Sequence, residues 1–311
     1  MKKIPIIMDV DTGIDDAIAI TLALSRPELD VKCITTVAGN RTIETTTRNT
    51  LDVIAYLGKD VPVAKGAVKP LVKEAKISPV THGESGLGNA VLPHTDKKPI
   101  EADAITAMRE ILENSPEKVT LVPTGPLTNI AVLLFAYPHV KEKIEKIVLM
   151  GGGAFEGNVN AAAEYNIYSD PEAASVVFKS GLPIIMCGLD VTMKAYATAD
   201  DIERIRKTGT NAGKFCADAL EYYYNRYKIN SRLPGCAVND AVTIAYIVNP
   251  EIVTAKPSRV LVDIDGVKSY GCTASDFRPD RDRSLDNALV CTDIDREKFI
   301  DMLVCAAESY K

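Results

Sequence analysis

The sequence predicts an α/β fold, with a mostly parallel sheet covered by helices on both faces, in a single domain over residues 1–311. Short apolar runs alternate with stretches of helical spacing nearly throughout the chain. This alternation is typical of strand–helix–strand units, in which consecutive strands run parallel. No interdomain linker, repeat or low-complexity tract interrupts the pattern, and 311 residues can bury one sizeable core.

Each element follows from its local pattern. Continuous apolar runs suit strands that are buried on both faces, and apolar positions three or four apart suit helices. Ser169 or Asp170, followed by Pro171, is a typical helix start. Strands are expected at Ile4–Met8, Val31–Val37, Val61–Ala64, Val119–Val122, Ile147–Met150 and Pro183–Cys187. Helices are expected at Ala17–Leu24, Thr42–Leu57, Ala102–Leu112, Leu127–Phe135, Pro171–Phe178, Ala199–Lys207 and Ala212–Tyr227.

Three segments depart from the alternation. Residues 65–100 contain few apolar positions and predict a long loop, which in a compact domain is usually functional. Residues 226–237 are rich in Asn, Arg, Pro and Gly and predict a second, mobile loop. Ser258–Cys291 has the pattern of antiparallel strands and turns near a sheet edge.

Composition excludes several classes of function. The net charge of −6 argues against binding nucleic acid or an anionic membrane through bulk charge. No apolar run is long enough to span a bilayer. Met-Lys-Lys leads directly into the first strand without the apolar core of a signal peptide. A cytoplasmic protein is therefore expected.

The first strand ends in a dense group of carboxylates. Asp9, Asp11, Asp15 and Asp16 fall at the turn between the first strand and the first helix. Carboxylates held this close repel one another, and Ca²⁺ or Mg²⁺ relieves the repulsion because such ions take several oxygen ligands. A solvated turn with one Asp capping the helix is the simpler interpretation, but capping accounts for one carboxylate and not for four. The group therefore predicts a metal site.

Other polar residues also follow the predicted strands. The carboxyl ends of parallel strands share one edge of a sheet, and ligands bind at that edge.

A series of short motifs along the chain resembles, in the same order, the motifs of the inosine–uridine-type nucleoside hydrolases. Residues 9–17, Asp-Val-Asp-Thr-Gly-Ile-Asp-Asp-Ala, resemble the DxDxGxDDA signature of that family. Further matches, in order, are Val37-Ala38-Gly39-Asn40, His82-Gly83-Glu84-Ser85-Gly86, residues 123–129, Met150-Gly151-Gly152-Gly153, Glu164-Tyr165-Asn166-Ile167, residues 170–174 and Asp276-Phe277-Arg278.

The resemblance implies a Rossmann-like domain, a bound Ca²⁺ and hydrolysis of the N-glycosidic bond of ribonucleosides to ribose and free base in nucleoside salvage. It also implies a small-molecule partner, the ribonucleoside, and assembly into a homodimer or homotetramer. The implied Ca²⁺ ligands are Asp11, Asp16, Asp240 and the main-chain carbonyl of Thr124. The implied ribose contacts are Asp15, Asn40, Asn158, Glu164 and Asn166, and Met150 would line the sugar pocket.

The implied reaction suits these residue types. Positive charge develops on the ribose in an oxocarbenium-like transition state, which carboxylates stabilise. Ca²⁺ lowers the pKa of a bound water, and Asp11 is placed to take its proton. Fixing both ribose hydroxyls aids the reaction by proximity and should reject 2′-deoxynucleosides.

One position departs from the family pattern. Many relatives have a histidine before the last metal aspartate as the acid that protonates the leaving base, whereas this chain has Asn239 before Asp240. An amide can hydrogen-bond to the base but cannot supply a proton near neutral pH. His82 is then the best titratable candidate on the base side. Tyr227 resembles a family tyrosine that approaches the base.

Three alternatives stay open. The chain could bind nucleosides or ribose with little turnover, since the histidine is missing, although Asp11 argues for catalysis. It could be a hydrolase for a modified nucleoside such as a 7-deazapurine, which lacks the ring nitrogen that an acid would protonate. Asp9-Val10-Asp11-Thr12 also resembles an Asp-nucleophile phosphohydrolase motif, but Asp15-Asp16 fits that chemistry poorly.

Overall fold

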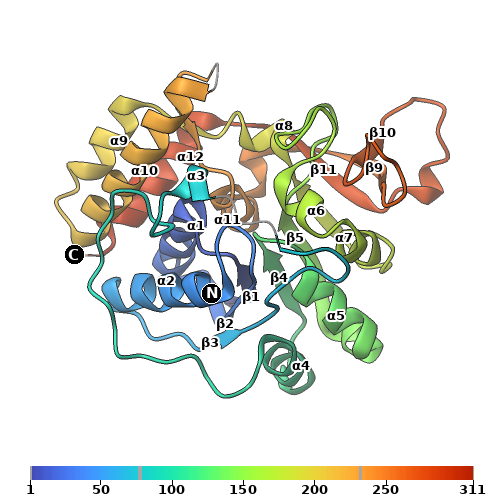
Figure 1. Cartoon of the computed structure of the whole chain (residues 1–311), viewed down its shortest axis with the longest axis horizontal. Coiled ribbons are helices and arrows are strands. Elements are labelled where there is room, and N and C mark those ends of the chain that lie inside the picture. Colours follow the sequence, from blue (N-terminus) through green and yellow to red (C-terminus); the bar gives the residue numbers. More distant parts are fainter. Residues whose placement is uncertain (1, 76–78, 231–232, 311) are drawn as a thin grey trace.

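The computed structural model describes residues 2–75, 79–230 and 233–310. Its centre is a nine-stranded sheet in the order β10-β9-β11-β6-β5-β4-β1-β2-β3 (Figure 1). These strands are β1 (Ile4–Val10), β2 (Leu29–Thr36), β3 (Val63–Lys65), β4 (Val119–Pro123), β5 (Ile144–Met150), β6 (Ile184–Cys187), β9 (Val253–Val262), β10 (Thr273–Asp276) and β11 (Ala288–Ile294). A separate antiparallel pair joins β7 (Tyr196–Ala197) and β8 (Cys236–Ala237).

Most of the sheet is parallel, as expected. Strands β1 to β6 and β11 run in one direction, and only β9 and β10 are antiparallel to their neighbours at one edge. This antiparallel edge confirms the pattern at Ser258–Cys291. The strand order reverses between β1 and β4, so two crossovers lead in opposite directions from that point. A crevice opens at such a switch point in open α/β sheets.

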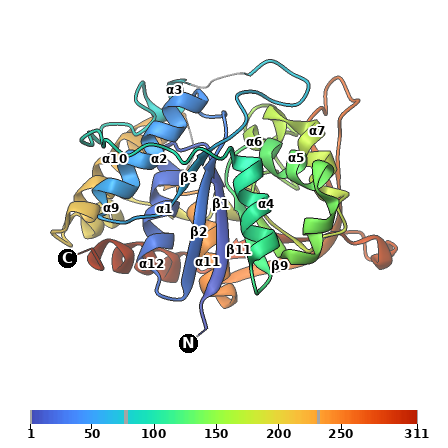
Figure 2. The ribbon, with the colours of Figure 1, turned by 90° about the horizontal axis from the view of Figure 1, so that it is seen from below.

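Helices cover both faces of the sheet (Figure 2). One face carries α1 (Ile14–Ser25), α2 (Ile43–Tyr56), α11 (Ala241–Val248) and α12 (Arg296–Glu308), with α9 (Ala199–Arg206) and α10 (Asn211–Asn230) packed outside them. The other carries α4 (Ala104–Asn114), α5 (Thr128–Ala136) and α7 (Pro171–Phe178). The short helices are α3 (Pro79–His82), α6 (Tyr165–Ser169) and α8 (Leu189–Thr192), and 3₁₀ turns occupy Pro138–Lys143, Pro250–Ile252 and Arg283–Leu285.

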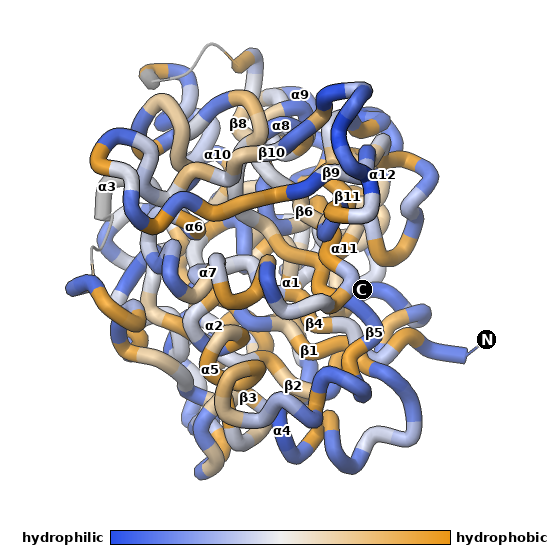
Figure 3. Tube along the Cα trace, turned by 90° about the vertical axis from the view of Figure 1, so that its right-hand side faces the viewer, coloured by the Kyte–Doolittle hydropathy of each residue, from blue (hydrophilic) through white to orange (hydrophobic). Residues whose placement is uncertain are grey.

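Alternation along β1 builds the two cores. Ile6 and Met8 belong to the core cluster that includes α1, whereas Ile7 belongs to the cluster that includes α4 and α5. Successive side chains of a strand point to opposite faces, so a strand buried on both sides must be apolar throughout. Figure 3 shows the resulting hydrophobic stretches along the central strands. None of the described helices is long and apolar enough to cross a membrane.

The predicted loop over residues 226–237 is partly wrong. Helix α10 continues through Asn230, and Cys236 and Ala237 form β8; residues 231 and 232 lie outside the described residues. Asn, Arg and Lys are compatible with a helix, and the first residue that cannot continue one is Pro234. The irregular stretch 65–100 is confirmed in its described part, where α3 is its only helix.

Candidate active site

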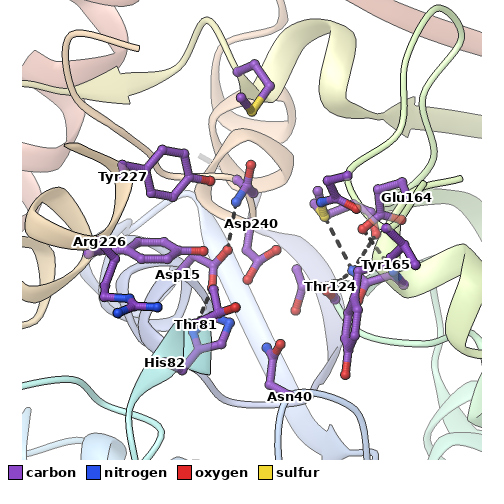
Figure 4. Close-up of a pocket in the computed structure, with 17 residues that line it drawn as sticks. Asp15, Asn40, Thr81, His82, Thr124, Glu164, Tyr165, Arg226, Tyr227 and Asp240 are labelled. Atoms are coloured by element: carbon purple, nitrogen blue, oxygen red, sulfur yellow. Dashed lines mark hydrogen bonds and ion pairs between the residues drawn. The ribbon is translucent and has the colours of Figure 1, made fainter. Parts of the chain in front are cut away.

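A pocket of about 670 Å³ opens at the switch point of the sheet (Figure 4). Strands β1, β2, β4 and β5 are adjacent and parallel, so the segments that follow them converge there. These segments supply Asp15, Asn40 and Thr124, and β5 itself ends at Met150. The lining residues are Asp15, Asn40, Thr81, His82, Thr124, Met150, Asn158, Val159, Glu164, Tyr165, Asn166, Met193, Tyr223, Arg226, Tyr227, Asn239 and Asp240.

Three carboxylates meet at the floor of the pocket, where Asp15 and Asp240 line the cavity and Asp16 lies next to them without lining it. Asp15, Asp16 and Asp240 are buried, and each offers an oxygen within 4.8 Å of the others. Asp15 and Asp16 begin α1, while Asp240 precedes α11, which packs against α1. Asp16 is held by the Thr124 hydroxyl at 2.7 Å and by the Gly13 N–H at 2.9 Å. The packing of α11 against α1 therefore brings Asp240 next to Asp15 and Asp16, which lie far from it in the sequence.

Asp11 lies behind this group and is fully buried. Its Oδ2 accepts the backbone N–H of Asn40 at 2.6 Å, and its Oδ1 has no hydrogen-bond partner among the described residues. The carboxylate can sit here because position 39 is a glycine: a Cβ on Gly39 would lie 2.2 Å from Asp11 Oδ2. The glycine that follows the second strand thus makes room for the aspartate that follows the first.

Burial and mutual repulsion raise the pKa values of these acids. Burial, with the charge of Asp15, raises the pKa of Asp16 to about 7. Burial, with the charges of Asp15, Asp16 and Asp11, raises the pKa of Asp240 well above its usual range. Burial, with the charge of Asp16, does the same to the pKa of Asp11. Such a cluster of carboxylates is favourable only with a compensating positive charge.

The donor set fits a hard divalent cation. Asp11 Oδ1 and Asp15 Oδ1 are buried acceptors without a partner among the described residues, and oxygen ligands of this kind are what Ca²⁺ takes. The Thr124 carbonyl accepts the side-chain N–H of Asn166 at 2.7 Å and keeps a second lone pair. The expected ligands Asp16, Asp240 and Thr124 thus meet at the floor, with Asp15 beside them and Asp11 behind.

The wall formed by β5 and α6 carries groups suited to sugar hydroxyls. Glu164 caps α6: its carboxylate accepts the backbone N–H groups of Asn166 and Ile167, and that of Gly152 at 2.8 Å. Burial raises the pKa of Glu164 to about 6. The other expected ribose contacts, Asp15, Asn40, Asn158 and Asn166, line the pocket too, and so does Met150.

His82 lies on the opposite wall, carried by α3. Its Nδ1 accepts the backbone N–H of Ile14 at 3.1 Å and lies 3.8 Å from Asp15 Oδ1. A Cβ on Gly13 would lie 2.6 Å from that Nδ1, so the motif glycine lets the imidazole approach. Burial lowers the pKa of His82, although the charge of Asp15 opposes this. The ring is therefore neutral, with its proton on Nε2, where it can donate a hydrogen bond.

Asn239 and two tyrosines complete this wall. The Asn239 side-chain N–H donates to Asp15 Oδ2 at 3.0 Å, and its Oδ1 has no partner among the described residues. The rings of Tyr223 and Tyr227 meet edge to face with centroids 5.1 Å apart, and Tyr223 lies 5.5 Å from His82. This aromatic surface beside polar donors suits a flat heterocycle.

The predicted candidates account for most, but not all, of the pocket. Asp9, on the first strand, lies away from it and is held by Thr35 and Asn129 at 2.6 and 2.8 Å. Six lining residues were not predicted as site residues: Thr81, Val159, Tyr165, Met193, Tyr223 and Arg226. Helical spacing could have found two of them, because Tyr223 and Arg226 share one face of α10 with Tyr227.

Comparison with known proteins agrees with this geometry. A family model described as "Inosine-uridine preferring nucleoside hydrolase" matches residues 6–301. The chain is 45% identical to the pyrimidine-specific ribonucleoside hydrolase RihA of Citrobacter koseri, covering 96% of each chain. It is 44% identical to RihA of Escherichia coli K12, covering 99% of each. A purine-preferring ribonucleoside hydrolase from Gardnerella vaginalis has a similar structure, with a TM-score of 0.92, 34% identity and 98% of each chain covered. The chain therefore belongs to the inosine–uridine preferring nucleoside hydrolase family.

Proposed function

We propose that this chain hydrolyses the N-glycosidic bond of ribonucleosides to ribose and free base, with Ca²⁺ as cofactor, in nucleoside salvage. The observation that carries the proposal is the pairing of two unlike surfaces in one pocket. Asp15, Asp16 and Asp240 gather at its floor, and Tyr223 and Tyr227 form a wall above them. The carboxylate floor suits the hydroxyl groups of a ribose, and the aromatic wall suits a flat nucleobase.

Asp16, Asp240 and the Thr124 carbonyl would hold the cation, together with Asp11 or Asp15. When bound, Ca²⁺ would act as a Lewis acid that lowers the pKa of a water and orients ribose hydroxyls. The protein supplies the rest: buried carboxylates stabilise the positive charge that develops on the ribose. Asp11, whose Oδ1 has no partner among the described residues, is proposed as the base that takes the proton from water.

A pyrimidine is the base that we propose. The relatives at 44–45% identity are named as pyrimidine-specific, whereas the purine-preferring structure is 34% identical. Asn239 supports this choice because its amide can hydrogen-bond to a base carbonyl but cannot protonate a purine ring nitrogen. Its unpartnered Oδ1 can in turn accept an N–H from the base.

Ribose release from a panel of nucleosides tests the proposal. The panel contains uridine, cytidine, inosine, adenosine and a 7-deazapurine ribonucleoside, with uridine 5′-monophosphate assayed for phosphate. We expect ribose from uridine at the highest kcat/KM and no phosphate. Binding of uridine without ribose release would identify a binding protein, and phosphate release would identify a phosphohydrolase. Release from the 7-deazapurine nucleoside alone would overturn the base assignment.

Two further expectations stay predictions. Assembly into a homodimer or homotetramer is testable by sedimentation of the purified protein, and a cytoplasmic location by fractionation of the cells that produce it.

A further inference from the structure

None of the described residues on the base side of the pocket is arranged to protonate a departing base. Asn239 is an amide whose N–H already donates to Asp15. His82 accepts the N–H of Ile14 at Nδ1, so its ring holds a single proton on Nε2 and is not an acid near neutral pH. The glycosidic bond must therefore break by another form of leaving-group stabilisation.

The tyrosines do not supply that acid either. Tyr223 and Tyr227 line the aromatic wall, and a phenol ordinarily keeps its proton near neutral pH because its usual pKa is about 10. Phenols of this kind donate hydrogen bonds while keeping their protons. The base thus departs with the electron pair of the broken bond, as an anion held by hydrogen bonds.

Arg226 places a positive charge on this side of the pocket. It lines the pocket from α10, one residue before Tyr227, and lies on the same wall as His82 and Thr81 (Figure 4). Its Nε is buried and has no hydrogen-bond partner among the described residues. A guanidinium is always charged near neutral pH, and leaving a buried donor such as this Nε unpaired is unfavourable. Its position therefore indicates an electron-rich ligand group.

The charges of the pocket are separated in the direction that bond breaking requires. Carboxylates of Asp15, Asp16 and Asp240 gather where the sugar becomes positive. Arg226 lies on the aromatic wall, where the base becomes negative. Fixed charges aimed at charge that develops in the transition state are among the largest contributions to catalysis.

We propose that Arg226 stabilises the departing base as an anion and so selects bases that delocalise negative charge onto a carbonyl beside the glycosidic nitrogen, as uracil does. This rests on the proposed nucleoside hydrolysis. The C1′–N1 bond breaks and its electron pair stays on the base. Water forms the new C1′–O bond and gives its proton to a carboxylate of the cluster. The released base takes up a proton from solvent.

A leaving-group series tests this role. Uridine, 5-fluorouridine and 4-nitrophenyl β-D-ribofuranoside carry leaving groups of increasing acidity, so they need progressively less stabilisation. We expect Arg226→Gln to lower kcat on uridine by about 10²-fold, the usual effect of removing one stabilising donor. The loss of kcat should be smaller for 5-fluorouridine. With the 4-nitrophenyl riboside, the kcat of Arg226→Gln should be close to that of the wild-type protein. Arg226→Lys should recover part of the loss.

Lys228→Gln is the matched control. It removes one positive charge from the same helix at an exposed position that does not line the pocket, and should leave all three rates unchanged. Equal losses on all three substrates, or wild-type rates for Arg226→Gln on uridine, would overturn the role of Arg226 while leaving the hydrolase assignment intact. A wild-type chain that releases ribose from no nucleoside would remove the proposed function and this inference with it.

Discussion

Asp11→Asn is expected to lower turnover of uridine on the order of 10²–10⁴-fold, the usual effect of losing a general base. Asp11 Oδ1 is buried without a partner among the described residues, while Oδ2 accepts the N–H of Asn40. An asparagine at this position can keep the second contact through its carbonyl oxygen. The fold should therefore survive, with an unchanged circular dichroism spectrum, and kcat should carry the loss.

Asp9→Asn is the matched control, because Asp9 is equally buried at the end of the same strand but lies away from the pocket. Its Oδ1 accepts from Thr35 and Asn129, and the carbonyl oxygen of an asparagine can accept both of these hydrogen bonds, so the amide should be tolerated there. Near-normal turnover in Asp11→Asn, together with a large loss in Asp15→Asn, would show that Asp15 is the base instead.

The second large effect concerns the sugar. 2′-Deoxyuridine should be hydrolysed on the order of 10⁴–10⁵-fold less efficiently than uridine, because a site built to pair a hydroxyl rejects the analogue that lacks it. Asp15 and Asp240 at the floor, and Asn166 on the wall, are buried groups that would lose a partner. The measurement is kcat/KM for the two nucleosides under identical conditions.

A second pair of nucleosides, with thymine as the base, is the control for that comparison. Ribothymidine and thymidine share a base and differ only at the 2′ position, so their ratio should match the ratio for uridine and 2′-deoxyuridine. Hydrolysis of 2′-deoxyuridine within about tenfold of uridine, which is the discrimination of a single apolar contact, would show that the carboxylate floor does not bind the 2′-hydroxyl.

Much of the fold could be predicted because it follows from local pattern. The continuous apolar run of Ile4–Met8 and the helical spacing after Asp16 correspond to β1 and α1. The end of α10 could not be placed this way, because the local signals conflict: Arg226 and Lys228 favour a helix, whereas Asn225 and Asn230 are typical of turns. In the structure Tyr227 packs against the main core, and this tertiary contact favours the helix.

The site also has a part that local sequence predicts and a part that depends on tertiary packing. Asp11, Asp15 and Asp16 are neighbours in sequence, so their gathering is a local matter. That Asp240 reaches them depends on the packing of α11 against α1, which the residues alone do not show and which only the family resemblance indicated. The hydrogen bond from Ile14 to His82 is likewise invisible in the sequence, and it changes His82 from a candidate acid into a hydrogen-bond donor.

The most direct test of a cation-dependent ribonucleoside hydrolase is ribose release from uridine, measured on protein as purified, after exhaustive chelation, and after Ca²⁺ is restored. The ion content and Tm are determined on the same three samples. The oxygen-ligand site predicts about one ion per chain, loss of release and a lower Tm on chelation, and recovery of both with Ca²⁺. Undiminished release from protein shown to hold no ion would contradict it.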